Sequence, residues 1–354
     1  MKAVTIVGAR PQFIKAAPIS RVWRQHGEEI LVHTGQHYDH NLSDIFFSEL
    51  EIPQPDYHLH VGSKSHGEQT GEMLTKIERI LLEEKPDLVI VYGDTNSTLA
   101  GGLAAAKLHV PVAHVEAGLR SFNRRMPEET NRVLTDHLST WLFCPTETAV
   151  AHLLREGMSE GVHMVGDIMV EAVQYNIQLA RRQSTILQQL ALTPDQFLLA
   201  TLHRAENTDH ESRLRSIVSA LNQIEYKVVL PLHPRTQARL AQWDLQITNP
   251  NVIMIAPIGY LDMLQLEAAA AKILTDSGGV QKEAFLLQTP CITMRDETEW
   301  VETVKWRANR LVGADERQIV EAAHERSVIH FDKIPPLYGA GRTADQIIHV
   351  LAKG

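Results

Sequence analysis

The chain contains the run Thr275-Asp276-Ser277-Gly278-Gly279-Val280-Gln281-Lys282-Glu283. It follows the apolar run Ala268 to Leu274 and leads into a helix-like segment, Glu283 to Gln288. A strand, a Ser-Gly-Gly turn and a helix start, in this order, are typical of proteins built from a parallel sheet covered by helices. The stretch therefore predicts an α/β fold.

The same turn predicts an anion site. Backbone N–H groups at a helix start have no partner within the helix, and the helix dipole favours negative charge there. Gly278 and Gly279 would let a phosphate approach the backbone closely, and Glu283 could accept hydrogen bonds from two ribose hydroxyls. These features indicate a nucleotide. An ordinary tight turn, in which Glu283 only complements the dipole, is the alternative, and short glycine motifs leave both open.

Bulk composition describes an ordinary globular protein with an acidic balance. The 354 residues suffice for two domains, 44% are apolar and 22% are charged. A net charge of −9 argues against nucleic acid or an anionic membrane as partner. Cys144 and Cys291 lie in apolar runs and are expected to be buried thiols. We find no signal peptide, no segment long enough to span a membrane and no metal-ligand spacing, and therefore expect a cytoplasmic protein without a metal centre.

Short runs rich in Val, Ile and Leu alternate with helix-patterned segments along the whole chain, as parallel strands covered on both faces do. The strand candidates are Val4 to Val7, Ile30 to His33, Leu88 to Tyr92, Val112 to Val115, Trp141 to Phe143, Phe197 to Leu202, Val228 to Leu232, Val252 to Ile255, Ile273 to Thr275 and Cys291 to Met294. They predict two Rossmann-like, doubly wound parallel-sheet domains that face each other across a cleft. We assign residues 1–166 to the first domain and 167–342 to the second, and expect a helix at 343–354 to pack back on the first.

Nearly every unusual polar residue follows a strand candidate directly. These residues are Arg10, Lys15, Gln36, His37, Asp94, Glu116, His203, Arg204, Glu206, His233, Ser277, Arg295 and Glu299. Ligands of open α/β sheets bind at the carboxyl ends of the strands. If the two halves face each other at these ends, all of these groups line one cleft.

The chemistry of those groups excludes some classes of enzyme. Neither the dinucleotide fingerprint G-x-G-x-x-G nor the ATPase motif G-x-x-x-x-G-K-[ST] is present, which argues against nicotinamide, flavin and ATP chemistry. Arg10 and Lys15 are a guanidinium and an ammonium that suit a diphosphate. For Lys15 alone, a surface salt bridge is equally compatible with the sequence.

Three carboxylates, Asp94, Glu116 and Glu128, suit general acid/base work. Each alone is more typical of a helix cap or a first helical turn, but three at one rim favour catalysis. His203 is accompanied by Arg204 and Glu206, which favours a functional role for it over that of a structural histidine.

Taken together, the motifs resemble one family closely: the non-hydrolysing UDP-N-acetylglucosamine 2-epimerases. The residues that carry the resemblance are Gly8 to Lys15, Gln36-His37, Gly93-Asp94-Thr95, His114 to Arg120, Pro127-Glu128-Glu129, Asn131-Arg132, His203-Arg204, Thr275 to Gly279 and Arg295-Asp296. They cover essentially the whole chain.

The resemblance implies a fold like that of GT-B glycosyltransferases, a homodimer, a UDP-sugar substrate and no cofactor. It places Arg10, Met263, Ser277, Gly278, Gly279 and Glu283 at UDP. It places Asp94, Glu116, Glu128, His203 and Lys15 at the reacting centre, and Gln36, His37, Arg132, Arg204, Arg295 and Trp300 near the sugar. The implied reaction eliminates UDP to give a 2-acetamidoglycal and re-adds it with inversion at C2.

Departures from the family pattern bear on the substrate. Trp300 stands where members acting on UDP-N-acetylglucosamine usually have arginine, and Gln12 stands where they have glutamate. Both changes resemble the branch acting on UDP-2,3-diacetamido-2,3-dideoxy-glucuronate, whose product feeds surface polysaccharide. Ala205 replaces the second arginine of the usual His-Arg-Arg-Glu, so we expect no allosteric regulation by substrate. A UDP-N-acetylglucosamine epimerase, a retaining GT-B glycosyltransferase, a UDP-sugar hydrolase and a non-catalytic UDP-sugar sensor are the alternatives.

Overall fold

The computed structural model describes residues 1–36, 50–326 and 329–353. The chain forms two compact units: Met1–Gln174 together with Pro336–Gly354, and Tyr175–Pro335. The domain assignment expected from the sequence, with boundaries after residues 166 and 342, stays a prediction.

The first unit contains a parallel sheet of seven strands in the order β3-β2-β1-β4-β5-β6-β7. Its strands are β1 (Lys2–Val7), β2 (Glu28–His33), β3 (Tyr57–His58), β4 (Leu88–Tyr92), β5 (Val112–Val115), β6 (Trp141–Cys144) and β7 (Val162–Met164). Its helices are α1 (Arg10–Trp23), α3 (His66–Glu84), α4 (Asn96–Lys107), α5 (Pro127–Leu138), α6 (Glu147–Arg155) and α16 (Thr343–Leu351), while α7 (Ile168–Gln183) passes from this unit into the next.

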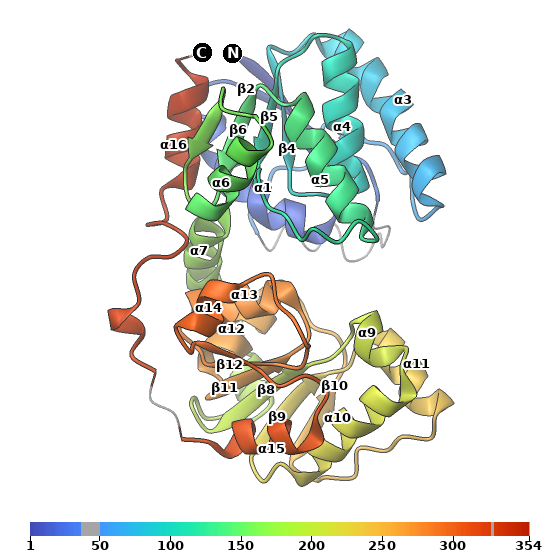
Figure 1. The fold of residues 1–354 in the computed structure, drawn as a ribbon, viewed down its shortest axis with the longest axis vertical. Helices are drawn as coiled ribbons and strands as arrows, with labels where there is room; N and C mark the ends of the chain where they lie inside the picture. Colours follow the sequence, from blue (N-terminus) through green and yellow to red (C-terminus); the bar gives the residue numbers. More distant parts are fainter. Residues whose placement is uncertain (37–49, 327–328, 354) are drawn as a thin grey trace. The chain divides into compact units, whose positions relative to one another are not determined.

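Helices cover both faces of this sheet. The helices α3, α4 and α5 lie side by side, and α16 packs against α1 (Figure 1). The chain adds β2 and β3 on one side of β1 and β4 to β7 on the other side. Right-handed crossovers made in these two opposite directions place their helices on opposite faces of the sheet. All five residues of β4 are buried, which explains its continuous apolar sequence.

The second unit contains a parallel sheet of six strands in the order β10-β9-β8-β11-β12-β13. Its strands are β8 (Phe197–Thr201), β9 (Lys227–Pro231), β10 (Val252–Ile255), β11 (Lys272–Thr275), β12 (Cys291–Thr293) and β13 (Asn309–Leu311). Its helices are α8 (Ile186–Gln189), α9 (Ala205–Thr208), α10 (Glu211–Gln223), α11 (Pro234–Gln242), α12 (Tyr260–Ala269), α13 (Gly278–Leu286), α14 (Val301–Lys305), α15 (Glu316–His324) and the 3₁₀ turn η1 (Phe331–Lys333).

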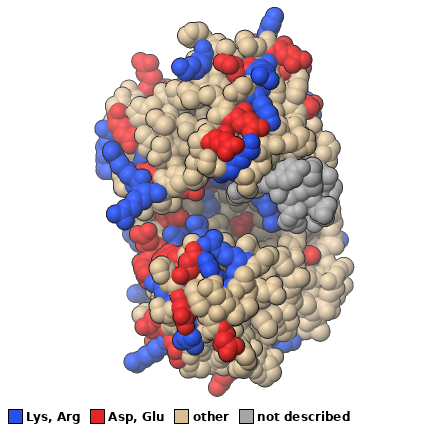
Figure 2. Space-filling model, turned by 90° about the vertical axis from the view of Figure 1, so that its right-hand side faces the viewer, with Lys and Arg blue, Asp and Glu red and all other residues tan. Residues whose placement is uncertain are grey.

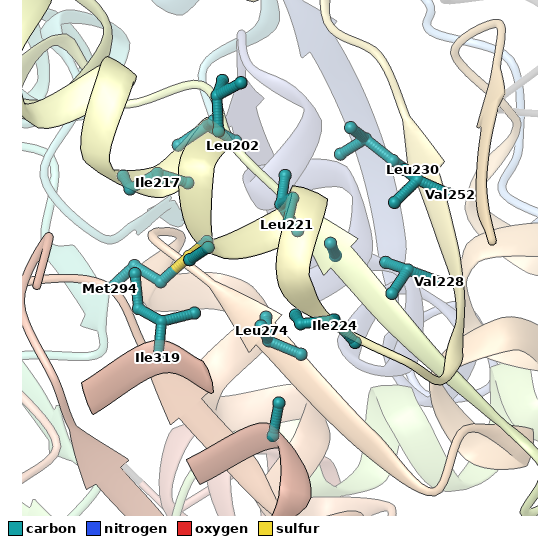
Figure 3. Packing of buried hydrophobic residues seen from close by; sticks show 14 of the residues in the cluster. Leu202, Ile217, Leu221, Ile224, Val228, Leu230, Val252, Leu274, Met294 and Ile319 are labelled. Carbon is teal, nitrogen blue, oxygen red and sulfur yellow. The ribbon is translucent and has the colours of Figure 1, made fainter. Parts of the chain in front are cut away.

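Two apolar layers sandwich the second sheet. Side chains of α10 and α15, including Ile217 and Ile319, pack with strand residues such as Leu274 in one layer (Figure 3). The other layer contains Leu266 of α12 and Ala284 of α13. Burial on both faces fixes the position of each strand end, and with it the loops that carry polar side chains.

These observations confirm the predicted fold class of two doubly wound α/β sheets. All ten predicted strands form, within one or two residues of the expected bounds, and Cys144 and Cys291 are buried free thiols as expected. The sequence did not reveal β3, β7 and β13, which are two or three residues long and lie at or near sheet edges. On the face shown in Figure 2, acidic and basic side chains are interspersed. Within the described residues, no helix is both long and apolar enough to cross a membrane.

Strand order reverses at one point in each sheet. In the first unit the reversal lies between β1 and β4, and in the second between β8 and β11. The crevice outside the carboxyl ends of the strands at such a switch point is the preferred ligand site of open α/β sheets. The switch points therefore locate one candidate ligand site in each unit.

Candidate functional site

Two carboxylates and two cations meet beside the switch point of the first unit. Lys15 of α1 donates a short hydrogen bond from Nζ to Glu116 Oε2, just after β5. Arg132 of α5 donates a short hydrogen bond from Nη2 to Asp94 Oδ2, just after β4. The Asp94 charge also acts on Lys15, and the Glu116 charge acts on Arg132. We call these four residues the acid/base cluster.

Both cations of the cluster stay charged despite their burial. Burial lowers the pKa of Lys15, but the charges of Glu116 and then Asp94 raise it more, and the net pKa lies above its ordinary value. Arg132 behaves in the same way, with Asp94 as the main opposing charge. The cluster therefore pairs each of its two carboxylates with a cation that stays charged.

The backbone holds Glu116 in an uncommon conformation. Its φ of 75° lies in the left-handed region, where a residue with a Cβ costs about 1–2 kcal/mol. The N–H groups of Glu116 and Ala117 both donate to the carbonyl oxygen of Phe143, at 3.1 Å each, and fix this turn. A Cβ on Gly93, which precedes Asp94, would lie 3.2 Å from Glu116 Oε2. Glycine at this position leaves room for the Glu116 carboxylate beside the residue that precedes Asp94.

Adjacent glutamates at the start of α5 have different environments. Glu128 is exposed in the first turn of the helix. Glu129 is buried and accepts hydrogen bonds from the N–H groups of Ser121 and Phe122, at 2.9 Å each. Glu129 thus fixes the preceding loop, and the acid/base role of Glu128 stays a prediction.

The sequence also predicted that three other residues of the first unit bind the substrate. Arg10 is the exposed first residue of α1. Gln36 Oε1 accepts from Ser97 N at 3.0 Å and from Ser97 Oγ at 2.7 Å, at the start of α4. His37 lies outside the described residues.

Gln12 has a structural role that the sequence did not indicate. Its side chain is buried, and its Oε1 accepts from Gly8 N at 2.8 Å and from Ala9 N at 3.1 Å. Its Nε2 donates to the carbonyl oxygen of Tyr92 at 2.8 Å and to Thr98 Oγ1 at 3.0 Å. The amide therefore ties the end of β1 to the end of β4. The bearing of Gln12 on the choice of substrate stays a prediction.

In the second unit, the predicted anion turn lies at the end of β11, directly at the switch point. The Ser277 hydroxyl caps α13 by accepting from Val280 N at 3.4 Å, and Ser277 N donates to Thr275 Oγ1 at 2.9 Å. A Cβ on Gly279 would meet only Ser277 Oγ within 4 Å, at 3.8 Å. The backbone of the first helical turn is thus accessible at Gly279, as close approach of a phosphate requires.

Asp276 organises the candidate ligand site of the second unit, and its role was missed in the sequence. The fully buried carboxylate accepts from His203 N at 3.1 Å, Arg204 N at 3.0 Å and Asn207 Nδ2 at 3.3 Å. It thereby fastens the loop after β8 to the end of β11. Burial lowers the pKa of His203, against the raising effect of Asp276, so the ring is mainly neutral at neutral pH. The sequence did contain one indication of this role: a carboxylate within a turn whose other residues are small and uncharged.

Trp300 is hydrogen-bonded to the anion turn. Its Nε1 donates to the carbonyl oxygen of Gly278 at 2.8 Å, and Lys282 Nζ lies 4.1 Å from the ring centroid. Beside it, Arg295 Nη1 donates to Glu299 Oε2 at 2.8 Å. A Cβ on Gly278 would lie 3.1 Å from Glu299 Oε1 and 3.7 Å from Arg204 Nη2. The predicted residues Arg204 and Trp300 therefore both border this turn.

Glu283 and Met263 are two further residues of the second unit that the sequence predicted to bind UDP. Glu283 is buried, and its Oε1 accepts from the Tyr260 hydroxyl at 2.9 Å. Met263, on α12, uses its N–H in the helix, donating to Gly259 O at 3.0 Å. The described residues contain no cluster of three or more His, Cys, Asp or Glu side chains suited to a metal ion.

A family model described as UDP-N-acetylglucosamine 2-epimerase matches residues 21–352. This chain belongs to that family. It is 53% identical over 99% of both chains to a UDP-N-acetylglucosamine 2-epimerase homolog of Methanococcus maripaludis. It is 52% identical over the full length of both chains to the UDP-2,3-diacetamido-2,3-dideoxy-D-glucuronate 2-epimerase of Pseudomonas aeruginosa.

A solved relative confirms the fold of the family. The UDP-N-acetylglucosamine 2-epimerase of Methanocaldococcus jannaschii, crystallised in complex with UDP-N-acetylglucosamine and UDP, matches with a TM-score of 0.88. It is 46% identical, and the match covers all of both chains. Membership of the 2-epimerase family, the GT-B-like fold and the isomerase class predicted from the sequence are therefore confirmed. The family does not by itself fix the sugar, because its members carry the names of two different UDP-sugars.

Proposed function

We propose that this chain epimerises C2 of a UDP-2-acetamido sugar without hydrolysing it. The acid/base cluster is the observation that carries this proposal. Inversion at a carbon needs one group that removes a proton and another that returns one from the opposite face. Asp94 and Glu116 are two separate carboxylates, each paired with its own cation, Arg132 and Lys15.

The elimination follows from the chemistry of the sugar. Hydrogen at C2 is not acidic in the starting sugar, because no carbonyl group adjoins it. When the bond from C1 to the UDP oxygen breaks, positive charge develops at C1 and a carboxylate can remove the C2 proton. The products are UDP and a 2-acetamidoglycal. Return of a proton to the other face of C2 and re-attack of UDP at C1 give the epimer.

Departure of UDP requires stabilisation of the negative charge on the diphosphate. Capped by Ser277, the helix start at Gly278 and Gly279 supplies backbone N–H groups and the positive end of the helix dipole. Arg10 and Lys15 are the cations that we assign to the same task, and Glu283 is the group that we assign to the ribose. Which of Asp94, Glu116 and Glu128 takes the proton is left open.

We infer that the preferred substrate is UDP-2,3-diacetamido-2,3-dideoxy-glucuronate. The Pseudomonas aeruginosa relative with this substrate in its name supports the inference. So does Trp300, which uses its ring N–H on Gly278 and offers no cation to the sugar. UDP-N-acetylglucosamine is the second candidate, supported by the Methanocaldococcus jannaschii relative. A role in surface polysaccharide synthesis, a homodimer and a cytoplasmic location complete the proposal.

Solvent isotope exchange tests the reaction. In deuterated water, the product formed by the wild-type protein should carry deuterium at C2, and the substrate pool should acquire it as the reaction reverses. A retaining glycosyltransferase would leave C2 unlabelled, and a hydrolase would accumulate free sugar and UDP. Either of these results would refute the proposal.

Side-by-side kinetics test the substrate. We expect kcat/KM for the diacetamido-glucuronate donor to exceed that for UDP-N-acetylglucosamine by at least about 100-fold, as discrimination involving a charged group allows. Trp300→Arg should narrow this ratio, whereas Trp306→Arg, a change at an exposed tryptophan beyond α14, is the matched control. Faster turnover of UDP-N-acetylglucosamine by the wild-type protein would show that the substrate inference is wrong.

A further inference from the structure

Helix α5 carries a carboxylate, Glu129, and a guanidinium, Arg132, that lie three residues apart and are in contact. Glu129 Oε2 accepts a hydrogen bond from Arg132 Nη1 at 3.1 Å. The other terminal nitrogen of the guanidinium, Nη2, donates to Asp94 Oδ2. One guanidinium therefore connects Glu129 with a carboxyl group of the acid/base cluster.

The Glu129 side chain is also fixed by the loop that precedes α5. Its Oε2 accepts from Ser121 N at 2.9 Å and from Ser121 Oγ at 2.8 Å, and its Oε1 accepts from Phe122 N at 2.9 Å. Burial raises the pKa of Glu129, but the hydrogen bonds from Ser121 and Phe122 and the charge of Arg132 lower it more, so its net pKa lies below the ordinary value. Glu129 thus holds a fixed negative charge against one end of the guanidinium.

Exposure to solvent increases along this series of contacts. The side chain of Glu129 is 6% exposed, that of Arg132 is 14% exposed and that of Asp94 is 31% exposed. A buried anchor is therefore joined, through a largely buried guanidinium, to a carboxyl group that solvent and a ligand can reach.

The shape of the guanidinium explains how Glu129 can act on Asp94. The group is planar and rigid, so fixing one terminal nitrogen orients the other. Nε of Arg132 is buried and has no hydrogen-bond partner among the described residues, so Nη1 and Nη2 make the hydrogen bonds that orient the plane. The backbone of Asp94 is held separately, because Asn131 Nδ2 donates to its carbonyl oxygen at 2.9 Å. The guanidinium adds the direction of the Asp94 side chain.

We propose that Glu129 is a positioning residue, which orients the Asp94 side chain through the shared guanidinium of Arg132. This role rests on the proposed function, in which Asp94 takes part in proton transfer at C2. Misplacing a reacting group by about 1 Å can lower a rate by about 100-fold. Glu129 therefore contributes to the rate of the chemical step without touching the sugar, whereas a residue that only fixed the loop would contribute to stability alone.

Glu129→Gln removes the charge that faces Arg132 and leaves a side chain of nearly the same size. The guanidinium is then held firmly at one end only. We expect kcat to fall by at least about tenfold, while KM for the UDP-sugar stays within about threefold of wild type.

Ser121→Ala is the matched control. It removes the 2.8 Å hydrogen bond to the same oxygen of Glu129 and leaves the contact with Arg132 in place. Its kcat should stay within about twofold of wild type, as is usual for an exposed side chain. An equal loss of kcat in Ser121→Ala and Glu129→Gln would show that Glu129 acts only by fixing the loop, and would overturn the positioning role.

A double-mutant cycle with Arg132→Lys tests whether the effect passes through the guanidinium. Lysine keeps the positive charge, but its single ammonium on a flexible stem cannot transmit an orientation from Glu129 to Asp94. Arg132→Lys should lower kcat by a similar factor, and adding Glu129→Gln to it should lower kcat no further, because residues of one ion-pair network are not additive. If the two factors multiply instead, the two residues act independently and the proposal is wrong.

Crystal structures of the variants give a readout that does not depend on activity. In Glu129→Gln the Asp94 side chain should leave its wild-type position or occupy more than one rotamer, whereas in Ser121→Ala it should stay. Arg132→Lys, which leaves the loop bonds of Glu129 intact, should show the same movement of Asp94 and serves if Glu129→Gln does not fold.

The two readouts distinguish this inference from the proposed function. An unmoved Asp94 side chain in both Glu129→Gln and Arg132→Lys would overturn the positioning role, whatever the kinetics. Failure of the wild-type protein to incorporate deuterium at C2 would instead refute the proposed function, and a displaced Asp94 would still show that Glu129 orients it.

Discussion

Glu267 of α12 gives the sharpest prediction about stability. Its side chain is fully buried, and among the described residues neither carboxyl oxygen has a hydrogen-bond partner. Burial, followed by the negative charge of Glu283, raises its pKa well above the ordinary value of 4.5. Burying an isolated ionised carboxylate in such a site costs far more free energy than keeping the group protonated, so Glu267 is a neutral acid in the folded protein.

The sign of the pH dependence follows from that shift. Above pH 4.5 the unfolded chain releases the Glu267 proton while the folded chain keeps it, so the contribution of Glu267 to stability is complete below pH 4.5 and is lost as pH rises. Each pH unit costs up to about 1.4 kcal/mol of unfolding free energy until the folded group ionises. Glu267→Gln resembles the neutral acid and removes this cost.

Melting temperatures of the variant and wild type, measured between pH 6 and pH 8, test the argument. The melting temperature of Glu267→Gln minus that of wild type should increase by roughly 3–6 °C for each unit by which the pH rises. This range takes about 2–4 °C per kcal/mol for a unit of this size. Glu225→Gln, at an exposed glutamate of the same unit, should show a gap that does not change with pH. A constant gap for Glu267→Gln would refute the assignment of a neutral buried acid.

Three further predictions concern the candidate ligand sites of the two units and the thiols. Asp94→Asn should lower kcat by about 10³-fold, within the range for loss of a general acid or base, while calorimetry finds UDP affinity within about threefold of wild type; an equal loss of affinity would contradict an acid/base role. Asp276→Ala should lower the unfolding free energy by about 3 kcal/mol in denaturant titrations, because three donors lose a buried charged acceptor, and an unchanged midpoint would contradict this. Cys144 and Cys291, each with a pKa raised to about 12 by burial, should react with a thiol reagent only after unfolding, so rapid labelling of the native protein would contradict their environment.

Strands in the interior of each sheet were predictable because burial on both faces demands continuous apolar sequence. The run Leu88 to Tyr92 is an example, and its bounds agree with β4. The short strands β3, β7 and β13 escaped prediction because two or three residues are too few to show a hydrophobic pattern. In addition, Tyr57–His58 is only half buried. Backbone pairing with a neighbour, rather than side-chain burial, defines these strands.

The site was predictable only in part. Some partners are far apart in the sequence, and the sequence does not show which side of a helix faces the interior. Carboxyl ends of strands revealed Asp94 and Glu116, but the partners of Asp276 are about 70 residues away in sequence, so its role needed the folded chain. Adjacent residues of a helix point about 100° apart. Because only the orientation of α5 decides which glutamate is buried, the sequence alone did not reveal the loop-fixing role of Glu129 beside Glu128.

The contact between α1 and α16 constrains the order in which the protein matures during synthesis. The first unit is built from two separate parts of the chain, with residues 175–335 between them. These residues leave the ribosome before α16, with its buried Ala344, Ile347 and Ile348, can pack against α1. The second unit is contiguous and can fold as soon as it emerges, whereas the first must wait with an uncovered helix. Nascent chains stalled before residue 336 should therefore bind chaperones through the first unit.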